Sequence, residues 1–557
     1  MDLDAIIRKY ILQNAIKFNG KANPGAIIGK VFAEDPELKK KGKEVSQKIN
    51  EILKDVNSMG VDKQRAELEE SAPELLEKKE KEERNIFAFL GFKDDEKVNS
   101  AFPPGPEKYP HIGHAKACLL NYMLAKQYNG KFILRFEDTN PKTAKNEFYE
   151  VMAENFKWLG VKWDELLYAS NFMDMFYDKA EFMIKEGLAY VDKSCQEDVK
   201  LSREKGNATK YRDNSVKQNL NLWEEMKKDE EGSAILRLKI DLKHKNTTMR
   251  DPTIFRIIEQ SHPKQGKRYR VWPNYDFQNA IMDSYSKVDM RLRSKEFELR
   301  GELQRWIQEK LCIEVTKTYE FGRFNLTGVL SSGRVIREKI ENKELVGWDD
   351  PSLTTIVALR RRGFLPEAIK NFVLSTGISK AEATMTWDDL IMHNKRLLDS
   401  TAKRYSAIFD PVELSIKGVP ATQIELHLNP NEKKGGRKFK VDGDFVLSKG
   451  DIENMKDGEV TRLMDCVNIM KDKGKVCFNS FKFEDFKGKG NKVINWLPGK
   501  ENIDVEVLMP NKEIMKGLAE KNVLDLKEGE IIQFERFGFC RLDKKDKNKL
   551  KFWFTHR

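Results

Sequence analysis

Residues 97–187 constrain the fold more than any other part of the chain, because short apolar strand segments alternate there with amphipathic helix segments. The first helix segment ends at Asn129-Gly130, and the second strand segment stops at Asn140-Pro141. The predicted elements are a strand at 97–102, a helix at 113–128, a strand at 132–136, and helices at about 144–159 and about 171–186. This order and spacing are typical of βαβ units, so we expect a parallel α/β sheet.

The spacing of apolar and turn residues divides the rest of the 557 residues into several regions before and after that sheet. An apolar stripe at helical spacing, from Ile6 to Ile16, predicts a helical start. The regular pattern of helix and strand segments weakens after Lys193 and returns near Tyr269, which indicates an insertion. After Pro411 the sequence predicts short strands separated by turns. We therefore expect a multidomain chain with six regions: a helical N-terminal region (1–95), the first half of the sheet domain (96–192), an insertion (193–267), the second half of the sheet domain (268–340), a helical connecting region (341–405) and an all-β module (406–557).

Charge and cysteine content narrow the class of protein. The chain has 100 Lys and Arg against 89 acidic residues, a net charge of +11. Such an excess suits a polyanionic partner such as nucleic acid, but lysine-rich surfaces are often only solubilising, so charge alone leaves both readings open. The six cysteines stand singly, without a Cys-x-x-Cys pair, so we predict neither a disulfide framework nor a structural zinc site.

The distribution of apolar residues predicts no membrane-spanning helix. No apolar run approaches the roughly 18 residues that a spanning helix needs. The first residues, Met1 to Asp4, carry two acids and lack the basic-then-apolar order of a secretory signal. We expect a cytoplasmic chain.

His111 and His114 flank Gly113 where the first predicted strand leads into the first predicted helix. Open α/β sheets bind ligands at the carboxyl ends of their strands, and a helix N-terminus offers free N–H groups to a phosphate. Two of the seven histidines in the chain stand at this point. The pattern predicts a phosphate site, and the alternative is a pair of ordinary turn histidines.

Several segments together resemble one family, the class I aminoacyl-tRNA synthetases, in the branch that charges tRNA with glutamate or glutamine. Pro103–Ala117, which contains the two histidines, resembles the ATP-site signature of that branch. Later segments resemble, in order, its second, third and fourth blocks and a block of its β-barrel anticodon domain: Arg135–Pro141, Asp251–Arg256, Val271–Phe277 and Phe534–Phe539. Lys21–Lys30 is similar to the helical N-terminal region of archaeal glutamyl-tRNA synthetases. Several such segments in the order of the family are stronger evidence for the resemblance than any one segment.

This resemblance implies a fold and a reaction. The sheet domain would be a Rossmann-like catalytic domain, the insertion would bind the acceptor stem, and the β module would form barrels that bind the anticodon. ATP and glutamate would form glutamyl-adenylate, and the glutamyl group would pass to the 2′-hydroxyl of the terminal adenosine of tRNA(Glu). Mg²⁺ would accompany ATP. Whether tRNA(Gln) is also charged with glutamate stays open, and we expect a monomer.

The resemblance also assigns roles to single residues. His111 and His114 would contact the ATP phosphates, with Pro104 and Gly113 in the same ATP site. Further along the chain, Glu137 would hold the α-ammonium group of glutamate and Tyr275 would line the amino-acid pocket.

Arg293 separates the two enzymes of the branch. It lies eighteen residues after Tyr275, where the glutamate enzymes have an arginine for the substrate γ-carboxylate and the glutamine enzymes have an uncharged residue. A guanidinium group matches a carboxylate bidentately. We expect that glutamine would leave this arginine buried and unpaired, at a cost of about 3–5 kcal/mol. The alternative is a surface arginine in a basic cluster.

Two departures from the family pattern affect the expected site. The residue before Phe102 is an arginine and a substrate contact in most relatives, but it is Ala101 here. The mobile loop of the family is rich in lysine, but here it reads LSSGRVI over residues 330–336, and its usual second lysine aligns with Ser332. We assign catalytic roles to Ser331, Ser332 and Arg334, and we predict that Arg334 replaces the missing lysine.

Three alternative functions remain at this point. A glutaminyl-tRNA synthetase would have the same fold and reaction, and Arg293 argues against it. A catalytically weakened paralogue that only binds tRNA is favoured by Ala101 and Ser332 but opposed by the intact histidine block. A nucleotidyltransferase without tRNA is disfavoured by the β module, which would bind unpaired anticodon bases.

Overall fold

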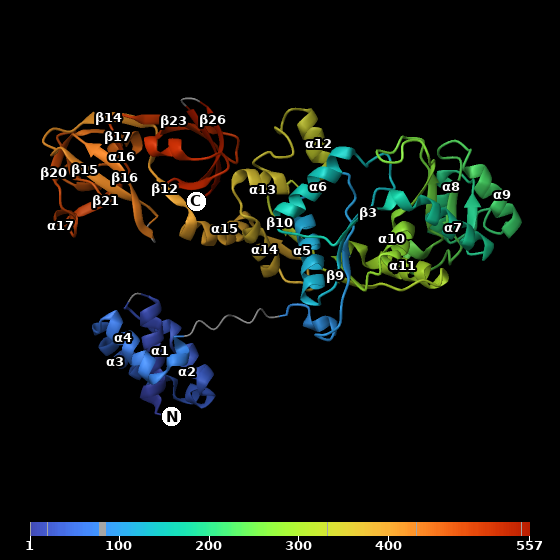
Figure 1. The fold of residues 1–557 in the computed structure, drawn as a ribbon, viewed down its shortest axis with the longest axis horizontal. Coiled ribbons are helices and arrows are strands. Elements are labelled where there is room, and N and C mark those ends of the chain that lie inside the picture. Colours follow the sequence, from blue (N-terminus) through green and yellow to red (C-terminus); the bar gives the residue numbers. More distant parts are fainter. Residues whose placement is uncertain (1, 19, 77–84, 331, 430–431, 547–548) are drawn as a thin grey trace. The chain divides into compact units, whose positions relative to one another are not determined.

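The computed structural model describes residues 2–18, 20–76, 85–330, 332–429, 432–546 and 549–557 (Figure 1). The chain divides into two compact units, Met1–Phe89 and Leu90–Arg557. Within its described residues, the first unit contains four α-helices: α1 (Leu3–Lys17), α2 (Ile28–Glu34), α3 (Gly42–Ser58) and α4 (Val61–Ser71). Their apolar side chains form one buried cluster that includes Ile7, Ile11, Val31, Ile49 and Leu68. The helical character predicted from the apolar stripe is confirmed.

The second unit begins with a parallel sheet. Its strands lie in the order β1 (Ser100–Phe102), β2 (Phe132–Phe136) and β3 (Glu165–Tyr168). The helices of this part are α5 (Ile112–Gln127), α6 (Asn146–Trp158) and α7 (Met173–Lys185). Both predicted strands and all three predicted helices are confirmed. The sequence did not predict β3, because its residues are only half-buried and include no long apolar run.

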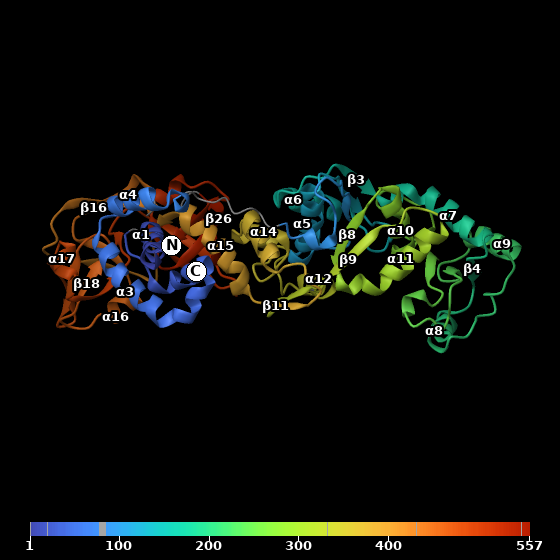
Figure 2. The ribbon, with the colours of Figure 1, turned by 90° about the horizontal axis from the view of Figure 1, so that it is seen from below.

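A second pair of parallel strands lies beside β1. β8 (Met290–Ser294) pairs with β9 (Lys317–Phe321), and the two are seen side by side in Figure 2. The N–H of Met290 donates to the carbonyl oxygen of Asn99, directly before β1. Asn121 of α5 also bridges the strands, because its Oδ1 accepts from the N–H of Leu292 at 2.8 Å and from the Ser100 hydroxyl at 2.7 Å. Strand order therefore reverses at β1, and such a switch point is where open α/β sheets bind ligands.

An antiparallel sheet interrupts this parallel arrangement. It has the order β4-β5-β6-β7, with β4 at Ala189–Asp192, β5 at Ile235–Leu238, β6 at Thr253–Ile257 and β7 at Val271–Pro273. Two helices, α8 (Gln196–Lys205) and α9 (Val216–Met226), lie between its first two strands in sequence. The sheet extends beyond residues 193–267 on both sides, so part of each sheet half as predicted belongs to it.

Helices lie before β8, between β8 and β9, and after β9 in sequence. α10 (Tyr275–Tyr285) packs against α11 (Glu298–Lys310). Next come a short parallel pair and four helices: β10 (Phe324–Leu326), β11 (Ala383–Met385), α12 (Gly333–Glu341), α13 (Ile356–Arg362), α14 (Pro366–Ser375) and α15 (Trp387–Thr401). No helix within the described residues combines the length and apolar character needed to cross a membrane.

The C-terminal part is built mainly from strands, as predicted. Its largest sheet has seven strands in the order β12 (Lys403–Tyr405), β25 (Ile531–Phe534), β26 (Gly538–Asp546), β27 (Lys549–His556), β23 (Asn502–Leu508), β24 (Ile514–Glu520) and β13 (Ala407–Phe409). The remaining elements are β14 (Pro411–Ser415), β15 (Thr422–Asn429), β16 (Glu432–Val441), β17 (Asp444–Ser448), α16 (Lys449–Glu453), β18 (Val460–Leu463), β19 (Asn468–Asp472), β20 (Lys475–Ser480), α17 (Phe483–Phe486), β21 (Gly490–Ile494) and β22 (Leu497–Pro498). Two separate apolar clusters, one around Trp496 and one around Phe534, indicate two cores.

Candidate active site

His111 and His114 form a reciprocal cap at the start of α5. The Nδ1 atom of His111 accepts a hydrogen bond from the N–H of Gly113 at 3.0 Å, and the Nδ1 atom of His114 accepts one from the N–H of His111 at 3.2 Å. Because both Nδ1 atoms are acceptors, each ring carries its proton on Nε2. The pair therefore offers two Nε2–H donors, as a phosphate site requires.

Burial keeps both histidines neutral. Desolvation, together with the charge of Lys108, lowers the pKa of His111 to about 3. Desolvation also lowers the pKa of His114 well below its usual value, with smaller contributions from His111 and Lys108. Gly113 makes the arrangement possible, because a Cβ there would lie 2.8 Å from Cε1 of His111. The glycine between the histidines is thus required by the folded-back ring.

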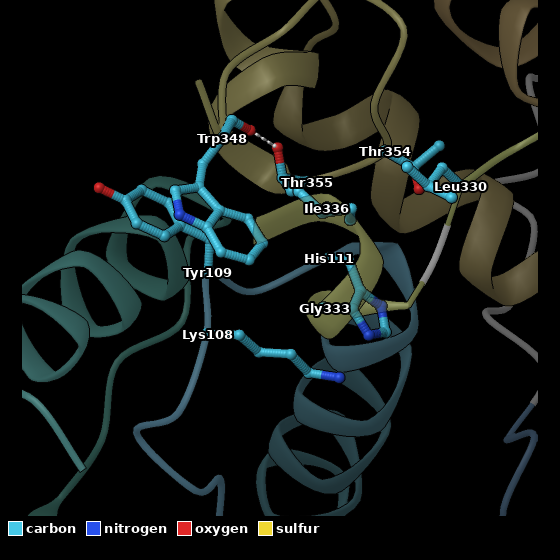
Figure 3. A pocket seen from close by; sticks show the side chains of 9 residues that line it. All are labelled: Lys108, Tyr109, His111, Leu330, Gly333, Ile336, Trp348, Thr354 and Thr355. Atoms are coloured by element: carbon cyan, nitrogen blue, oxygen red, sulfur yellow. Dashed lines mark hydrogen bonds between the residues drawn. The ribbon is translucent and has the colours of Figure 1, made fainter. Parts of the chain in front are cut away.

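A pocket opens beside His111 (Figure 3). It is lined by residues from the loop before α5, the start of α12 and the segment before α13: Lys108, Tyr109, His111, Leu330, Gly333, Ile336, Trp348, Thr354 and Thr355. Tyr109 and Trp348 stack with ring centroids 5.2 Å apart and an interplanar angle of 8°. The N–H of Ile112 donates to the carbonyl oxygen of Thr354 at 3.1 Å, so the segment before α13 is attached to the start of α5.

The segment at 330–336 supplies one wall of this pocket. Ser332 is the N-cap residue of α12 and is exposed, and Arg334 is exposed in the first turn. Arg334 makes no hydrogen bond or ion pair with any residue that the structure describes, and Ser331 lies outside the described residues. The structure thus brings Leu330 and Gly333 to His111, while the role of Arg334 stays a prediction.

Pro104 connects the two histidines to a second, buried cluster of charged side chains. Its carbonyl oxygen accepts from the N–H of Glu137 at 3.0 Å, so the loop after β1 and the end of β2 are joined. The Glu137 side chain is buried, and its Oε1 accepts from Nε of Arg135 at 2.8 Å. Gln278 and Asn279 of α10 also donate to this carboxylate. Burial raises the pKa of Glu137 even though Arg135 opposes the shift.

Asp283 of α10 bridges two arginines on different strands. Its Oδ1 lies 2.7 Å from Nη2 of Arg135 on β2, and its Oδ2 lies 2.8 Å from Nη1 of Arg291 on β8. β1 lies between these strands, and Ala101 is on the same face as Arg135, because it pairs with Ile133 in the parallel register. Asp283 thus links β2 to β8 across the intervening β1, on the face of the sheet that carries Ala101.

Arg293 is buried and paired. Its Nε and Nη2 both lie 3.0 Å from Oε1 of Glu320 on β9, and its Nη1 lies 2.8 Å from Oε1 of Gln304 on α11. Arg291 approaches the same Gln304 oxygen at 3.3 Å, so the two guanidinium groups share one acceptor. Burial, and next the charge of Arg291, lowers the pKa of Arg293.

This pairing corrects one sequence-based argument. We expected glutamine to leave Arg293 without a partner, but Glu320 supplies a carboxylate whatever the substrate is. The alternative of a surface arginine is wrong as well, because Arg293 is 6% exposed. The expectation that Arg293 stands without a partner is therefore wrong, and its part in recognising a substrate stays a prediction.

Tyr275 stands at the start of α10 within the same cluster. Its ring lies 5.6 Å from that of Phe297, and the guanidinium of Arg300 lies 5.6 Å from its centroid. Burial raises the pKa of Tyr275, and the charges of Arg291, Glu137 and Arg293 act on it. The three predicted substrate contacts, Glu137, Tyr275 and Arg293, are thus brought into one charged cluster.

Sequence reasoning missed several members of this cluster. Gln278, Asn279 and Asp283 are buried polar residues on α10, and Arg291 alternates with Leu292 on β8. Two signals pointed to them: polar residues at helical spacing from Tyr275 within an otherwise apolar helix, and two arginines two residues apart in a strand. Both signals mark polar or charged side chains that face the interior.

Metal ligands are not grouped in the parts of the chain that the structure describes. No set of three or more His, Cys, Asp or Glu side chains there is arranged to hold a metal ion.

Three family models match successive parts of the chain. Residues 97–400 match the catalytic domain of the tRNA synthetases class I (E and Q), and residues 402–479 and 493–543 match two anti-codon binding domains of the same group.

Curated relatives match along the whole chain. A glutamate–tRNA ligase of Pyrococcus furiosus is 40% identical over 575 residues, and one of Methanobrevibacter smithii is 35% identical over 559 residues, each covering 100% of both chains. A solved glutamate-tRNA synthetase from Elizabethkingia anophelis superimposes with a TM-score of 0.42 at 19% identity, over 55% of this chain and 72% of that chain. From the family matches and the full-length relatives, the chain belongs to the class I tRNA synthetases of the glutamate and glutamine branch.

Proposed function

We propose that this chain is a glutamate–tRNA ligase, which activates glutamate with ATP and transfers it to tRNA(Glu). The observation that carries the proposal is the buried pair of guanidinium groups, Arg291 and Arg293, beside Tyr275 and Glu137 at the sheet's switch point. Two cations that share an interior site suit a substrate with an acidic side chain. The full-length relatives named glutamate–tRNA ligases support the same substrate.

In the first step, an oxygen of the glutamate α-carboxylate attacks the α-phosphorus of ATP. The bond from that phosphorus to the bridging oxygen breaks, and pyrophosphate leaves with the electron pair. The attacking carboxylate is already ionised at neutral pH, so the step needs positioned donors more than a general base. His111 and His114 donate from Nε2 to phosphate oxygens, and Pro104 and Gly113 hold the loop that carries them.

In the second step, the 2′-hydroxyl of the terminal adenosine attacks the glutamyl carbonyl, and AMP leaves. Glu137 holds the α-ammonium group, Tyr275 lines the pocket, and Arg293 with Arg291 faces the γ-carboxylate. Ser331, Ser332 and Arg334 act at the phosphates from the segment before α12. These roles rest on the family resemblance, and the clustering of Glu137, Tyr275 and Arg293 supports them.

Mg²⁺ would enter this reaction with ATP. The nine residues that line the pocket beside His111 include no carboxylate, so triphosphate oxygens and water would supply the ligands of Mg²⁺. The ion would neutralise part of the triphosphate charge.

The remaining regions would hold tRNA. We assign the antiparallel β4–β7 sheet and its helices to the acceptor stem, and the C-terminal β module, as closed barrels, to the anticodon. The match of residues 402–479 and 493–543 to anti-codon binding domains supports the second assignment. The six predicted region bounds, a monomeric state, a cytoplasmic location and charging of tRNA(Gln) stay predictions.

Aminoacylation with labelled glutamate or glutamine, each on tRNA(Glu) and on tRNA(Gln), tests the function. We expect esterification of tRNA(Glu) with glutamate. Esterification of tRNA(Gln) with glutamate would show the additional misacylating activity. Glutamine on tRNA(Gln) would replace the proposal with a glutaminyl-tRNA synthetase. Tight tRNA binding without ester formation would identify a weakened paralogue.

A further inference from the structure

Lys108 is a cation of the nucleotide pocket that the family pattern does not account for. It lies in the loop before α5 and lines the pocket together with His111 and Gly333 (Figure 3). Its aliphatic stem packs on the first residue of α12, since a Cβ on Gly333 would lie 2.8 Å from Cδ of Lys108. Lys108 therefore joins the histidine loop to the segment at 330–336.

The Lys108 ammonium group has no anionic partner among the residues that the structure describes. The adjacent Glu107 instead accepts a hydrogen bond from the Thr143 hydroxyl at 3.0 Å. Lys131 of the same sheet domain, by contrast, pairs with Glu165 at 2.8 Å. The positive charge of Lys108 is nevertheless close enough to act on both His111 and His114. A lone cation beside two neutral N–H donors is an arrangement suited to an anion.

The position of Lys108 also matches the missing lysine of the mobile loop. The resemblance places that lysine at Ser332, and Ser332 is the direct neighbour of Gly333, on which Lys108 packs. The loop's own remaining cation, Arg334, is exposed and is not among the residues that line the pocket. A lysine reaching in from the other wall can thus occupy the space that a lysine at 332 would fill.

We propose that Lys108 supplies the cationic contact to the ATP triphosphate that the segment at 330–336 lacks at Ser332. The inference rests on the proposed function, because it assigns a further residue to the same activation step. The ammonium group would stabilise the charge that develops on pyrophosphate as it leaves. Lys108 is then a catalytic residue of this chain, and Arg334 makes the smaller contribution.

Four variants test this assignment: Lys108→Ala, Lys108→Arg, Arg334→Ala and the double variant Lys108→Ala/Ser332→Lys. Lys131→Ala is the matched control, because Lys131 precedes β2 at the opposite end of the strand from the site. The measurement is glutamate-dependent exchange of pyrophosphate into ATP in the presence of tRNA, with separate KM values for ATP and glutamate.

We expect Lys108→Ala to reduce kcat/KM for ATP on the order of 100-fold, the size found when one donor to a developing anion is removed. The KM for glutamate should stay within about twofold, Lys108→Arg should retain most of the rate, and Arg334→Ala should lose less than Lys108→Ala. The double variant should regain at least tenfold over Lys108→Ala, because it returns the cation to the loop.

Wild-type exchange in Lys108→Ala would overturn the proposal, as would a larger loss in Arg334→Ala or no gain in the double variant. If the protein exchanged pyrophosphate with no amino acid, the proposed function would fail, and calorimetric titration with ATP and Mg²⁺ would still decide on Lys108. Weaker ATP binding by Lys108→Ala than by Lys131→Ala would then support the contact, and equal binding would refute it.

Discussion

The two ends of the candidate site differ in how their charges are balanced. At the amino-acid end, the side chains of Arg135, Asp283, Arg291 and Arg293 are each at most 6% exposed, and each has an ion-pair partner. At the nucleotide end, the two histidines are neutral and Lys108 has no partner among the described residues. Charges are thus paired where we propose that glutamate binds, and left unpaired where we propose that ATP binds.

This difference has a physical reason. Glutamate is small and enters a buried site, where an unpaired charge would be costly before the substrate arrives. In the proposed reaction, ATP would bring several negative charges and Mg²⁺ to the pocket beside His111, where cations would be hydrated until it binds. The ion pairs of the amino-acid end are formed before the substrate binds, whereas the cation of the nucleotide end would gain its counter-charges from ATP. Variants at the two ends should therefore fail in different ways.

Arg293→Gln should have the largest effect, because it breaks a buried ion pair. The Glu320 carboxylate, 8% exposed, would lose its guanidinium partner, and the free energy of unfolding should fall by about 3–5 kcal/mol. Glutamate-dependent exchange should be lost as well. Urea denaturation and exchange kinetics measure the two effects.

The double variant Arg293→Gln/Glu320→Gln separates stability from recognition. It removes both charges of the pair, so most of the lost stability should return while glutamate activation stays absent. If Arg293→Gln were as stable as the wild type, the paired description of the amino-acid end would be wrong.

His111→Asn should have the next largest effect, and only on the nucleotide side. Asparagine is a good N-cap residue, so α5 keeps its cap, but the Nε2–H donor is removed. We expect kcat/KM for ATP to fall by roughly 100- to 1000-fold, with the KM for glutamate and the urea midpoint nearly unchanged. Equal losses for both substrates would indicate that the ring only shapes the site.

Arg291→Met tests whether Arg291 replaces the arginine that is absent at Ala101. Asp283 keeps its partner Arg135 at 2.7 Å, so the loss of stability should be smaller than for Arg293→Gln. Removing a charge-assisted contact to glutamate should raise its KM by roughly 10- to 100-fold and leave the KM for ATP unchanged. The KM for glutamate of Arg291→Lys should lie between those of the wild type and Arg291→Met. An unchanged KM for glutamate in Arg291→Met would exclude a substrate contact.

The two ends also differ in how far the sequence predicts them. His111, Gly113 and His114 lie within four residues, so a local pattern was enough to predict a phosphate site at the start of a helix. The amino-acid end joins residues that are far apart in sequence, such as Arg135 and Asp283, which are separated by 148 positions. No local pattern shows that Glu320 pairs with Arg293 or that Asp283 bridges Arg135 and Arg291.

Local patterns also decided which parts of the fold could be predicted from the sequence. Strands with buried apolar runs, such as β2, were predicted, whereas the half-buried edge strand β3 was not. The inserted sheet was visible as a loss of regularity, but its first and last strands, β4 and β7, are buried and apolar and look in sequence like parts of the parallel sheet. Periodicity identifies elements, and strand pairing, which is nonlocal, decides the sheet to which each element belongs.

The smallest effect concerns pH and again distinguishes the ends. The pKa of His111 is lowered to about 3 in the folded state and is about 6.5 in an unfolded chain, so the unfolded state binds the proton first as pH falls. The contribution of this histidine to stability is therefore fully present above pH 6.5 and is lost as pH falls from there towards about 3. Its slope is at most about 1.4 kcal/mol per pH unit. The urea midpoint of His111→Asn should thus fall less than that of the wild type between pH 7 and pH 5, while the two coincide at pH 8. Parallel pH profiles for the two proteins would mean that the imidazole is not held neutral, and the nucleotide end would then carry a charged pair rather than two neutral donors.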